Sequence, residues 1–252
     1  LDSLPGMKEN NPEKRRPPAA GGGIAMQIKL IALDLDGTLL DTLDAWHQLE
    51  VELSQQVGHV FSKEDSDVLT TLTIPETGDY MHNRFGLGKS GEDVVRMMND
   101  FLIEYYRTQA RERSGALSFV RELHERGVAM SVASSSPQSY LQAGLGATGF
   151  TPYLEAIVSV DDVGASKREP AVYDRARTLM GTQLAATWVF EDAAYALRTV
   201  RAAGYHTVGI YDCDISGTQT ELKELADVFV TGYEGLSAED FLELARRARR
   251  AW

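Results

Sequence analysis

Apolar residues along the chain fall into short continuous runs that alternate with longer segments of helical period. The first run, residues 28–34, stays apolar up to a terminal aspartate, which suits a strand buried on both faces of a sheet. Similar runs follow at residues 128–134, 155–160, 187–192, 206–212 and 226–230. Helical periods lie between most of them, at residues 117–126, 139–145, 171–180 and 193–203. The alternation predicts an α/β fold with a Rossmann-like parallel sheet and helices on both faces.

Residues 43–112 interrupt this alternation directly after the first strand. They carry no strand pattern, and helical periods occupy residues 43–57, 63–71 and 91–111. A helical block inserted at this point is expected to form a small domain of its own. We therefore predict an α/β core domain of residues 26–42 and 113–252. The insertion, residues 43–112, is predicted to be an all-helical cap over whatever the first strand presents.

Residues 1–25 have a different composition from the remainder of the chain. They contain four of the eight prolines and a run of three glycines, with few apolar residues. Such a segment cannot bury enough apolar surface to offset the entropy lost on ordering. We predict a disordered N-terminal tail, after which Met26 is a candidate for the natural start.

The charge balance narrows the range of partners. The net charge is −12, which disfavours non-specific binding to nucleic acid or to an anionic membrane. No apolar run approaches the roughly 20 residues that cross a bilayer, and no secretory signal is visible. The single cysteine, Cys213, cannot form an internal disulfide. These features favour the reducing cytoplasm, and nothing in the sequence indicates an oligomeric state.

Two aspartates stand at the end of the first predicted strand, in the segment DLDGT at residues 34–38. Ligands of open α/β sheets bind beyond the carboxyl ends of the strands, so Asp34 and Asp36 are expected to serve one site. Carboxylate oxygens suit Mg²⁺, and carboxylates also act as nucleophiles and proton carriers. The pair could instead cap a turn. A calcium loop is excluded, because its sixth and twelfth positions would be Leu39 and Ala45.

Three further polar signals follow later strands or loops. Ser134 and Ser135 precede a predicted helix, where hydroxyl and backbone N–H groups can bind an anion or simply cap the helix. Lys167 precedes another helix and could neutralise phosphate, although a solvated surface lysine is the plain alternative. Glu191 and Asp192 directly follow a buried run, where acids are costly unless they are paired or bound to metal. The coincidence of all signals at strand ends predicts a single site.

Together these segments resemble a known family. The segment DLDGTLLDT at residues 34–42, Ser134, Lys167 with its nearby proline, and FEDA at residues 190–193 resemble the four motifs of the haloacid dehalogenase superfamily. The helical insertion is similar to the C1-type cap of subclass I, which contains phosphoglycolate phosphatase and β-phosphoglucomutase. The resemblance covers about residues 26–235. One departure is the third motif, which reads Lys-Arg-Glu-Pro rather than Lys-Pro-x-Pro.

The resemblance implies a role for each residue of the reaction centre. Asp34 would be the nucleophile, which forms an aspartyl-phosphate. Asp36 would be the general acid and base. Ser134 would hold a phosphoryl oxygen, with Ser135 beside it in the phosphate site. Lys167 would pair with Asp34 and with the phosphate.

The resemblance also implies a metal site. Asp192 would bind Mg²⁺ together with a carboxylate oxygen of Asp34 and the backbone carbonyl of Asp36. Glu191 would either support these ligands or contact the metal directly. Mg²⁺ and Lys167 would then supply the positive charge that an acidic protein needs in order to handle phosphate.

The expected activity is Mg²⁺-dependent hydrolysis of a small phosphorylated metabolite. Dehalogenases of the superfamily lack the second acid of the first motif, so Asp36 argues for phosphate chemistry. A β-phosphoglucomutase-like sugar phosphomutase would use the same core residues and remains an alternative. A non-catalytic binding protein on this fold is a second alternative, although the presence of all the reactive residues speaks against it.

Overall fold

A computed structural model describes residues 28–69, 72, 74–214 and 216–249. The predicted tail, residues 1–25, lies outside the described residues, as do residues 70–71 at the end of one predicted helix. No helix in the described part of the chain is both long enough and apolar enough to cross a bilayer.

Six strands form a sheet in the order β5-β4-β1-β6-β7-β8, and every neighbouring pair is parallel. Their bounds are β1 Leu30–Leu33, β4 Ala129–Ser134, β5 Ala156–Ser159, β6 Thr187–Glu191, β7 His206–Ile210 and β8 Val228–Val230. All six lie within the strands expected from the apolar runs. The predicted α/β class with a parallel sheet is therefore confirmed.

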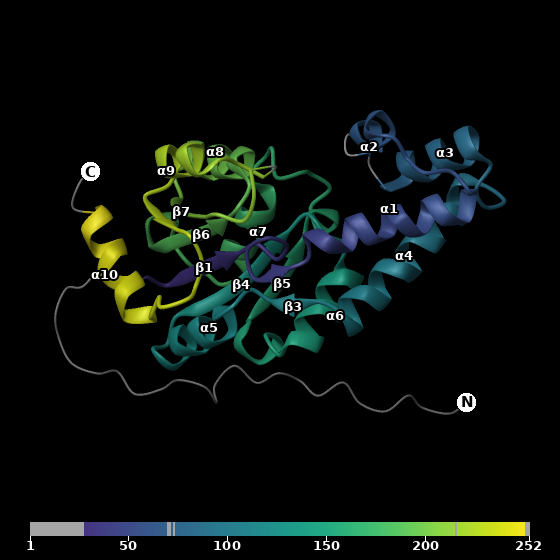
Figure 1. Ribbon diagram of the computed structural model, residues 1–252. Coiled ribbons are helices and arrows are strands. Elements are labelled where there is room, and N and C mark those ends of the chain that lie inside the picture. The colour runs from purple at the N-terminus through teal and green to yellow at the C-terminus, as the bar shows by residue number, and fades with distance from the viewer. Residues whose placement is uncertain (1–27, 70–71, 73, 215, 250–252) are drawn as a thin grey trace, which may run out of the picture.

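The apolar runs are explained by burial on both faces of the sheet. In β1, Ile31 and Leu33 belong to one hydrophobic cluster, and Ala32 between them belongs to a second cluster on the opposite face. Six helices cover the two faces of the sheet, namely α5 Ala116–Glu125, α6 Gln138–Thr148, α7 Ala171–Leu179, α8 Ala194–Ala202, α9 Gln219–Leu225 and α10 Ala238–Arg249. Figure 1 shows them on both sides of the sheet. Single 3-10 turns lie at Thr151–Tyr153, Val160–Asp162 and Leu184–Ala186.

The inserted block consists of four helices that extend away from the sheet (Figure 1). They are α1 Leu43–Val57, α2 Lys63–Leu69, α3 Ile74–Phe85 and α4 Gly91–Thr108. The first was predicted to the residue, whereas α3 was missed. Its helical pattern is weak because three turns of the helix bury only Thr77, Gly78 and Met81.

The end of the block differs from the prediction. Instead of a helix to residue 111, α4 ends at Thr108, and β3 Arg111–Glu112 pairs antiparallel with β2 Leu40–Asp41. The expectation of a block without strands is therefore wrong at its last residues. A two-residue strand has no periodicity to detect, and its partner lies about 70 residues earlier in the chain. This two-stranded ribbon of β2 and β3 holds the two ends of the insertion together.

Candidate active site

Three carboxylates meet at the carboxyl end of the sheet. Asp34 directly follows β1, while Glu191 ends β6 and Asp192 follows it. Leu33 and Phe190 are register partners in the adjacent strands β1 and β6, so the residues after them emerge side by side. One oxygen from each carboxylate lies within 4.8 Å of the other two, and the exposed fractions are only 7%, 0% and 5%.

Lys167 lies at this cluster rather than at the surface. Its Nζ is 2.6 Å from Asp34 Oδ1 and 2.6 Å from Glu191 Oε1, and the residue is 1% exposed. The hydroxyl of Tyr173 in α7 donates a second hydrogen bond to Glu191 Oε1 at 2.5 Å. A buried lysine with two carboxylate partners is charged and held in place. The plain reading of a solvated lysine is therefore wrong.

The electrostatics of the cluster show an excess of negative charge. Burial, followed by repulsion from Asp34, raises the pKa of Glu191 to about 8 and that of Asp192 to about 7. Burial also raises the pKa of Asp34. Burial lowers the pKa of Lys167, but Asp34 and Glu191 outweigh it and hold this pKa above its usual value. One ammonium group thus faces three carboxylates, which favours a further cation.

The donor atoms fit a hard divalent cation. Glu191 Oε2 is buried and accepts no hydrogen bond from any residue that the structure describes, so it is free to face an ion. The cluster consists of carboxylate oxygens, which are the ligands that Mg²⁺ takes. Of the four residues predicted as metal ligands, Asp34, Glu191 and Asp192 are brought together. The Asp36 carboxylate is not in this group, and its expected contact through the backbone carbonyl stays a prediction.

Asp36 is held instead by three hydroxyl groups. Its Oδ1 accepts hydrogen bonds from Thr42 (2.6 Å) and from Tyr106 (2.5 Å), and its Oδ2 accepts one from Ser136 (2.6 Å). Thr42 precedes α1, Tyr106 belongs to α4 of the inserted block, and Ser136 follows β4. Three donors fix the carboxylate in one orientation. Tyr106 was not predicted from the sequence. It lies in a helix 70 residues after Asp36 in the chain, and a single tyrosine at that separation gives no signal in the sequence.

The two serines predicted to bind phosphate have different environments. Ser134 ends β4, is 1% exposed, and its Oγ accepts the backbone N–H of Ser136 at 3.1 Å. Ser135 is exposed. Ser134 therefore lies in the same loop as Ser136, whose hydroxyl reaches Asp36. The phosphate contact of both serines stays a prediction.

A turn at Gly37 brings the Asp36 segment against Asp192. Gly37 has a φ of 70°, and a Cβ there would lie 2.6 Å from Asp192 Oδ2, so no larger residue fits without displacement. Arg113, just after β3, donates to the carbonyl oxygens of Gly37 and Tyr211 and pairs with Asp212 at 3.3 Å. Arg113 was not predicted from the sequence, although it holds this turn from the position directly after β3.

The parallel sheet carries carboxylates and a buried lysine at its carboxyl edge. Comparison with known proteins identifies the class of protein that has this arrangement as a hydrolase. The sequence profile of the haloacid dehalogenase-like hydrolase family matches residues 31–210. The chain belongs to this family. This confirms the resemblance drawn from the four motifs, and it confirms at the family level a hydrolase that acts on phosphate esters.

One of the relatives of the chain is named a phosphatase. Protein CbbY of Rhodobacter capsulatus is 30% identical over 193 residues, which span 73% of this chain and 85% of that protein. Validoxylamine A 7'-phosphate phosphatase of Streptomyces hygroscopicus subsp. limoneus is 24% identical over 206 residues, or 79% and 95% of the two chains. The crystal structure of β-phosphoglucomutase from Clostridium difficile has a TM-score of 0.67 at 18% identity, and the match covers 90% of this chain and 100% of that one. This last likeness shows a shared fold.

Proposed function

We propose that the chain is a Mg²⁺-dependent phosphatase that hydrolyses a small phosphate monoester through an aspartyl-phosphate on Asp34. One observation carries the proposal: Asp34 lies 2.6 Å from buried Lys167 and within the carboxylate cluster, while Asp36, two residues on, is oriented by three hydroxyls. A nucleophile, a cation and an oriented proton carrier thus meet at one point. A cytoplasmic location stays a prediction.

In the first step a carboxylate oxygen of Asp34 attacks phosphorus. A P–O bond to Asp34 forms, the bond to the ester oxygen breaks, and protonated Asp36 gives its proton to the leaving oxygen. Lys167 neutralises part of the charge on Asp34 and on the phosphoryl oxygens. Asp34, Asp192 and Glu191 would hold Mg²⁺, which supplies further charge neutralisation when bound. The loop of Ser134 and Ser135 would contact the remaining phosphoryl oxygens.

In the second step water attacks the phosphoryl group and displaces Asp34. Asp36, now ionised, takes a proton from the attacking water, and the bond between phosphorus and Asp34 breaks. Inorganic phosphate is released, and both aspartates return to their initial forms. The hydroxyls of Thr42, Tyr106 and Ser136 keep Asp36 aimed at the same position in both steps.

These contacts support the proposed division of the chain. Residues 26–42 and 113–252 would form the core that carries the nucleophile, and residues 43–112 the cap. Tyr106 is the cap residue that reaches Asp36, and the ribbon of β2 and β3 supports a boundary near residue 42. A cap of this kind encloses small molecules better than protein substrates.

The activity is tested with a panel of small phosphate esters, assayed with Mg²⁺ and with EDTA. We expect inorganic phosphate with Mg²⁺, no turnover with EDTA, and recovery when Mg²⁺ is restored. Without a cation, the excess negative charge of the cluster repels an anionic substrate, and burial keeps the pKa of Asp34 raised. Sugar-phosphate isomerisation without phosphate release would indicate a mutase instead. No turnover of any ester would indicate the binding protein.

The variant Tyr106→Phe tests the orientation of Asp36 by the inserted block. We expect kcat to fall about tenfold with KM nearly unchanged, because a hydrogen bond to a charged group is worth about 1.5–3 kcal/mol and Thr42 still holds the same oxygen. Steady-state kinetics on any accepted ester measures both constants.

Tyr140→Phe is the matched control. The ring of Tyr140 in α6 stacks on that of Tyr106 at 5.4 Å, and its hydroxyl donates to Asn99 of α4 rather than to Asp36. Both variants therefore remove one hydroxyl between the inserted block and the remainder of the chain. Equal losses of kcat in the two variants would show that Tyr106 acts only through general stability.

A further inference from the structure

Tyr173 connects the hydrophobic interior of the core to the carboxylate cluster. It is the third residue of α7, a helix that packs against β1, β4 and β5. The residue is 1% exposed, and it belongs to the same hydrophobic cluster as Ala32 and Val189 on one face of the sheet. From this packed position its hydroxyl reaches the carboxyl edge of the sheet and donates to Glu191 Oε1 at 2.5 Å.

The two oxygens of Glu191 have different surroundings. Oε1 accepts hydrogen bonds from two donors, the hydroxyl of Tyr173 and the Nζ of Lys167 at 2.6 Å. Oε2 is buried and has no hydrogen-bond partner among the residues that the structure describes. A buried carboxylate oxygen is costly to leave in that state unless a donor or a cation meets it. The donors on Oε1 thus leave Oε2 as the oxygen available to a cation.

Lys167 by itself does not fix the orientation of this carboxylate. Its ammonium group is shared with Asp34 Oδ1, which also lies at 2.6 Å, and an ammonium on a flexible four-carbon chain acts as a point charge. The ring of Tyr173, in contrast, is held by its neighbours in the hydrophobic cluster, so its hydroxyl donates from a fixed point. The hydroxyl is also neutral and adds no positive charge that would repel a cation.

We propose that Tyr173 is a positioning residue for the cation site, because its hydroxyl orients Glu191 and thereby raises the affinity of the cluster for Mg²⁺. The proposal rests on the proposed Mg²⁺-dependent function and deepens it, since it names a residue outside the ligand set that controls how tightly the ion is held. Loss of a hydrogen bond to a metal-ligating group typically costs about 10- to 100-fold in metal affinity.

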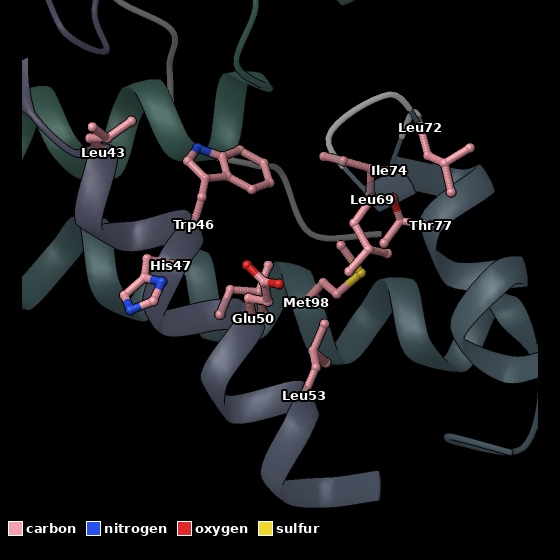
Figure 2. A pocket seen from close by; sticks show the side chains of 11 residues that line it. Leu43, Trp46, His47, Glu50, Leu53, Leu69, Leu72, Ile74, Thr77 and Met98 are labelled. Atoms are coloured by element: carbon pink, nitrogen blue, oxygen red, sulfur yellow. The ribbon is translucent and has the colours of Figure 1, made fainter. Parts of the chain in front are cut away.

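Measured binding of Mg²⁺ should report the carboxylate cluster. Among the residues that the structure describes, Asp34, Glu191 and Asp192 form the single group of three or more carboxylate, imidazole or thiol side chains that could share an ion. The cavity of the inserted block, which Figure 2 shows, has a mainly apolar lining with one carboxylate, that of Glu50. We therefore expect titration calorimetry with Mg²⁺ to give one site per chain.

The variant Tyr173→Phe, titrated with Mg²⁺ in a calorimeter, tests the proposal. The ring and its packing are kept and only the donor is lost, while Lys167 continues to donate to Oε1. We expect the dissociation constant for Mg²⁺ to rise about 10- to 100-fold. The Mg²⁺ concentration for half-maximal hydrolysis should rise by a similar factor. At saturating Mg²⁺, kcat and the KM for the ester should be nearly unchanged, because the contact between Lys167 and Asp34 remains.

Tyr205→Phe is the matched control. The ring of Tyr205 lies 6.3 Å from that of Tyr173 in the same hydrophobic cluster, and its hydroxyl donates to a different carboxylate, Asp174 Oδ1, at 2.6 Å. Both variants therefore remove a tyrosine hydroxyl from a carboxylate, but only Tyr173→Phe alters Glu191. The Mg²⁺ affinity of Tyr205→Phe should equal that of the wild type. Thermal unfolding without Mg²⁺ measures what each hydroxyl contributes to stability apart from the ion.

The outcomes separate this inference from the proposed function. Equal Mg²⁺ affinity in the wild type and Tyr173→Phe would overturn the inference and leave the phosphatase intact. An equal loss of affinity in both variants, or unfolding of Tyr173→Phe at the assay temperature, would give the hydroxyl a general structural role and overturn it as well. If the wild type binds Mg²⁺ but hydrolyses no ester, the proposed function fails, and the same affinities still decide the role of Tyr173. A wild type that binds no Mg²⁺ overturns both.

Discussion

Asp34→Asn is expected to lower turnover of every phosphate ester by on the order of 10⁴-fold or more. Asparagine keeps the size of the side chain but removes the anionic oxygen that would attack phosphorus and the charge that pairs with Lys167. The variant should remain folded, because removal of one negative charge relieves repulsion on Glu191 and Asp192. Phosphate release and thermal unfolding, measured on the same preparation, check both parts.

Asp44→Asn provides the control for this substitution. It makes the same chemical change ten residues later, at an exposed position in α1 where the carboxylate accepts a hydrogen bond from Gln48. Its kcat should match the wild type. Near-normal activity of Asp34→Asn would remove the nucleophile assignment. A phosphorylated protein trapped by rapid acid quench from the wild type, and absent from Asp34→Asn, would support it directly.

Asp36→Asn is expected to slow turnover by about 10²–10⁴-fold, the usual contribution of a positioned general acid and base. An amide can still meet the hydroxyls of Thr42, Tyr106 and Ser136, so the loop should keep its shape. Binding of inorganic phosphate should be nearly unchanged, because Lys167 and the carboxylate cluster are intact. Stopped assays for rate and calorimetry for phosphate affinity separate the two properties.

The leaving group offers a second measurement on Asp36. An ester whose alcohol is strongly acidic, such as p-nitrophenyl phosphate, needs little protonation as it departs. The loss in Asp36→Asn for the first step should therefore be smaller with this ester than with an alkyl phosphate. An equal loss with both esters, or an unchanged rate, would contradict the role of Asp36 as the acid.

The strands of the sheet were readable because burial on both faces leaves a plain mark in the sequence. A strand such as β1, with Ile31 and Leu33 on one side and Ala32 on the other, has to be apolar throughout. The helices α9 and α10 were not predicted from the sequence, and α9 is short and buries little beyond Leu222. A helix held mainly by tertiary contacts has a weak pattern of its own.

Part of the candidate site was also readable from the sequence. Asp34, Lys167, Glu191 and Asp192 were each identified from their positions at the ends of strands or before helices, and the structure brings these four together. Parallel strands end at one edge, so local sequence was enough to predict that their terminal residues share a site. Their roles in catalysis are settled only by the experiments above.

The sequence by itself determined the class of fold and the acidic and basic groups at the edge of the sheet, because both depend on periodicity and on position along a strand. Only the tertiary structure decided what surrounds Asp36. Tyr106 and Arg113 act through contacts with segments distant in the chain. Such contacts follow from how the helices pack against the sheet, and packing leaves no periodic trace in any one segment.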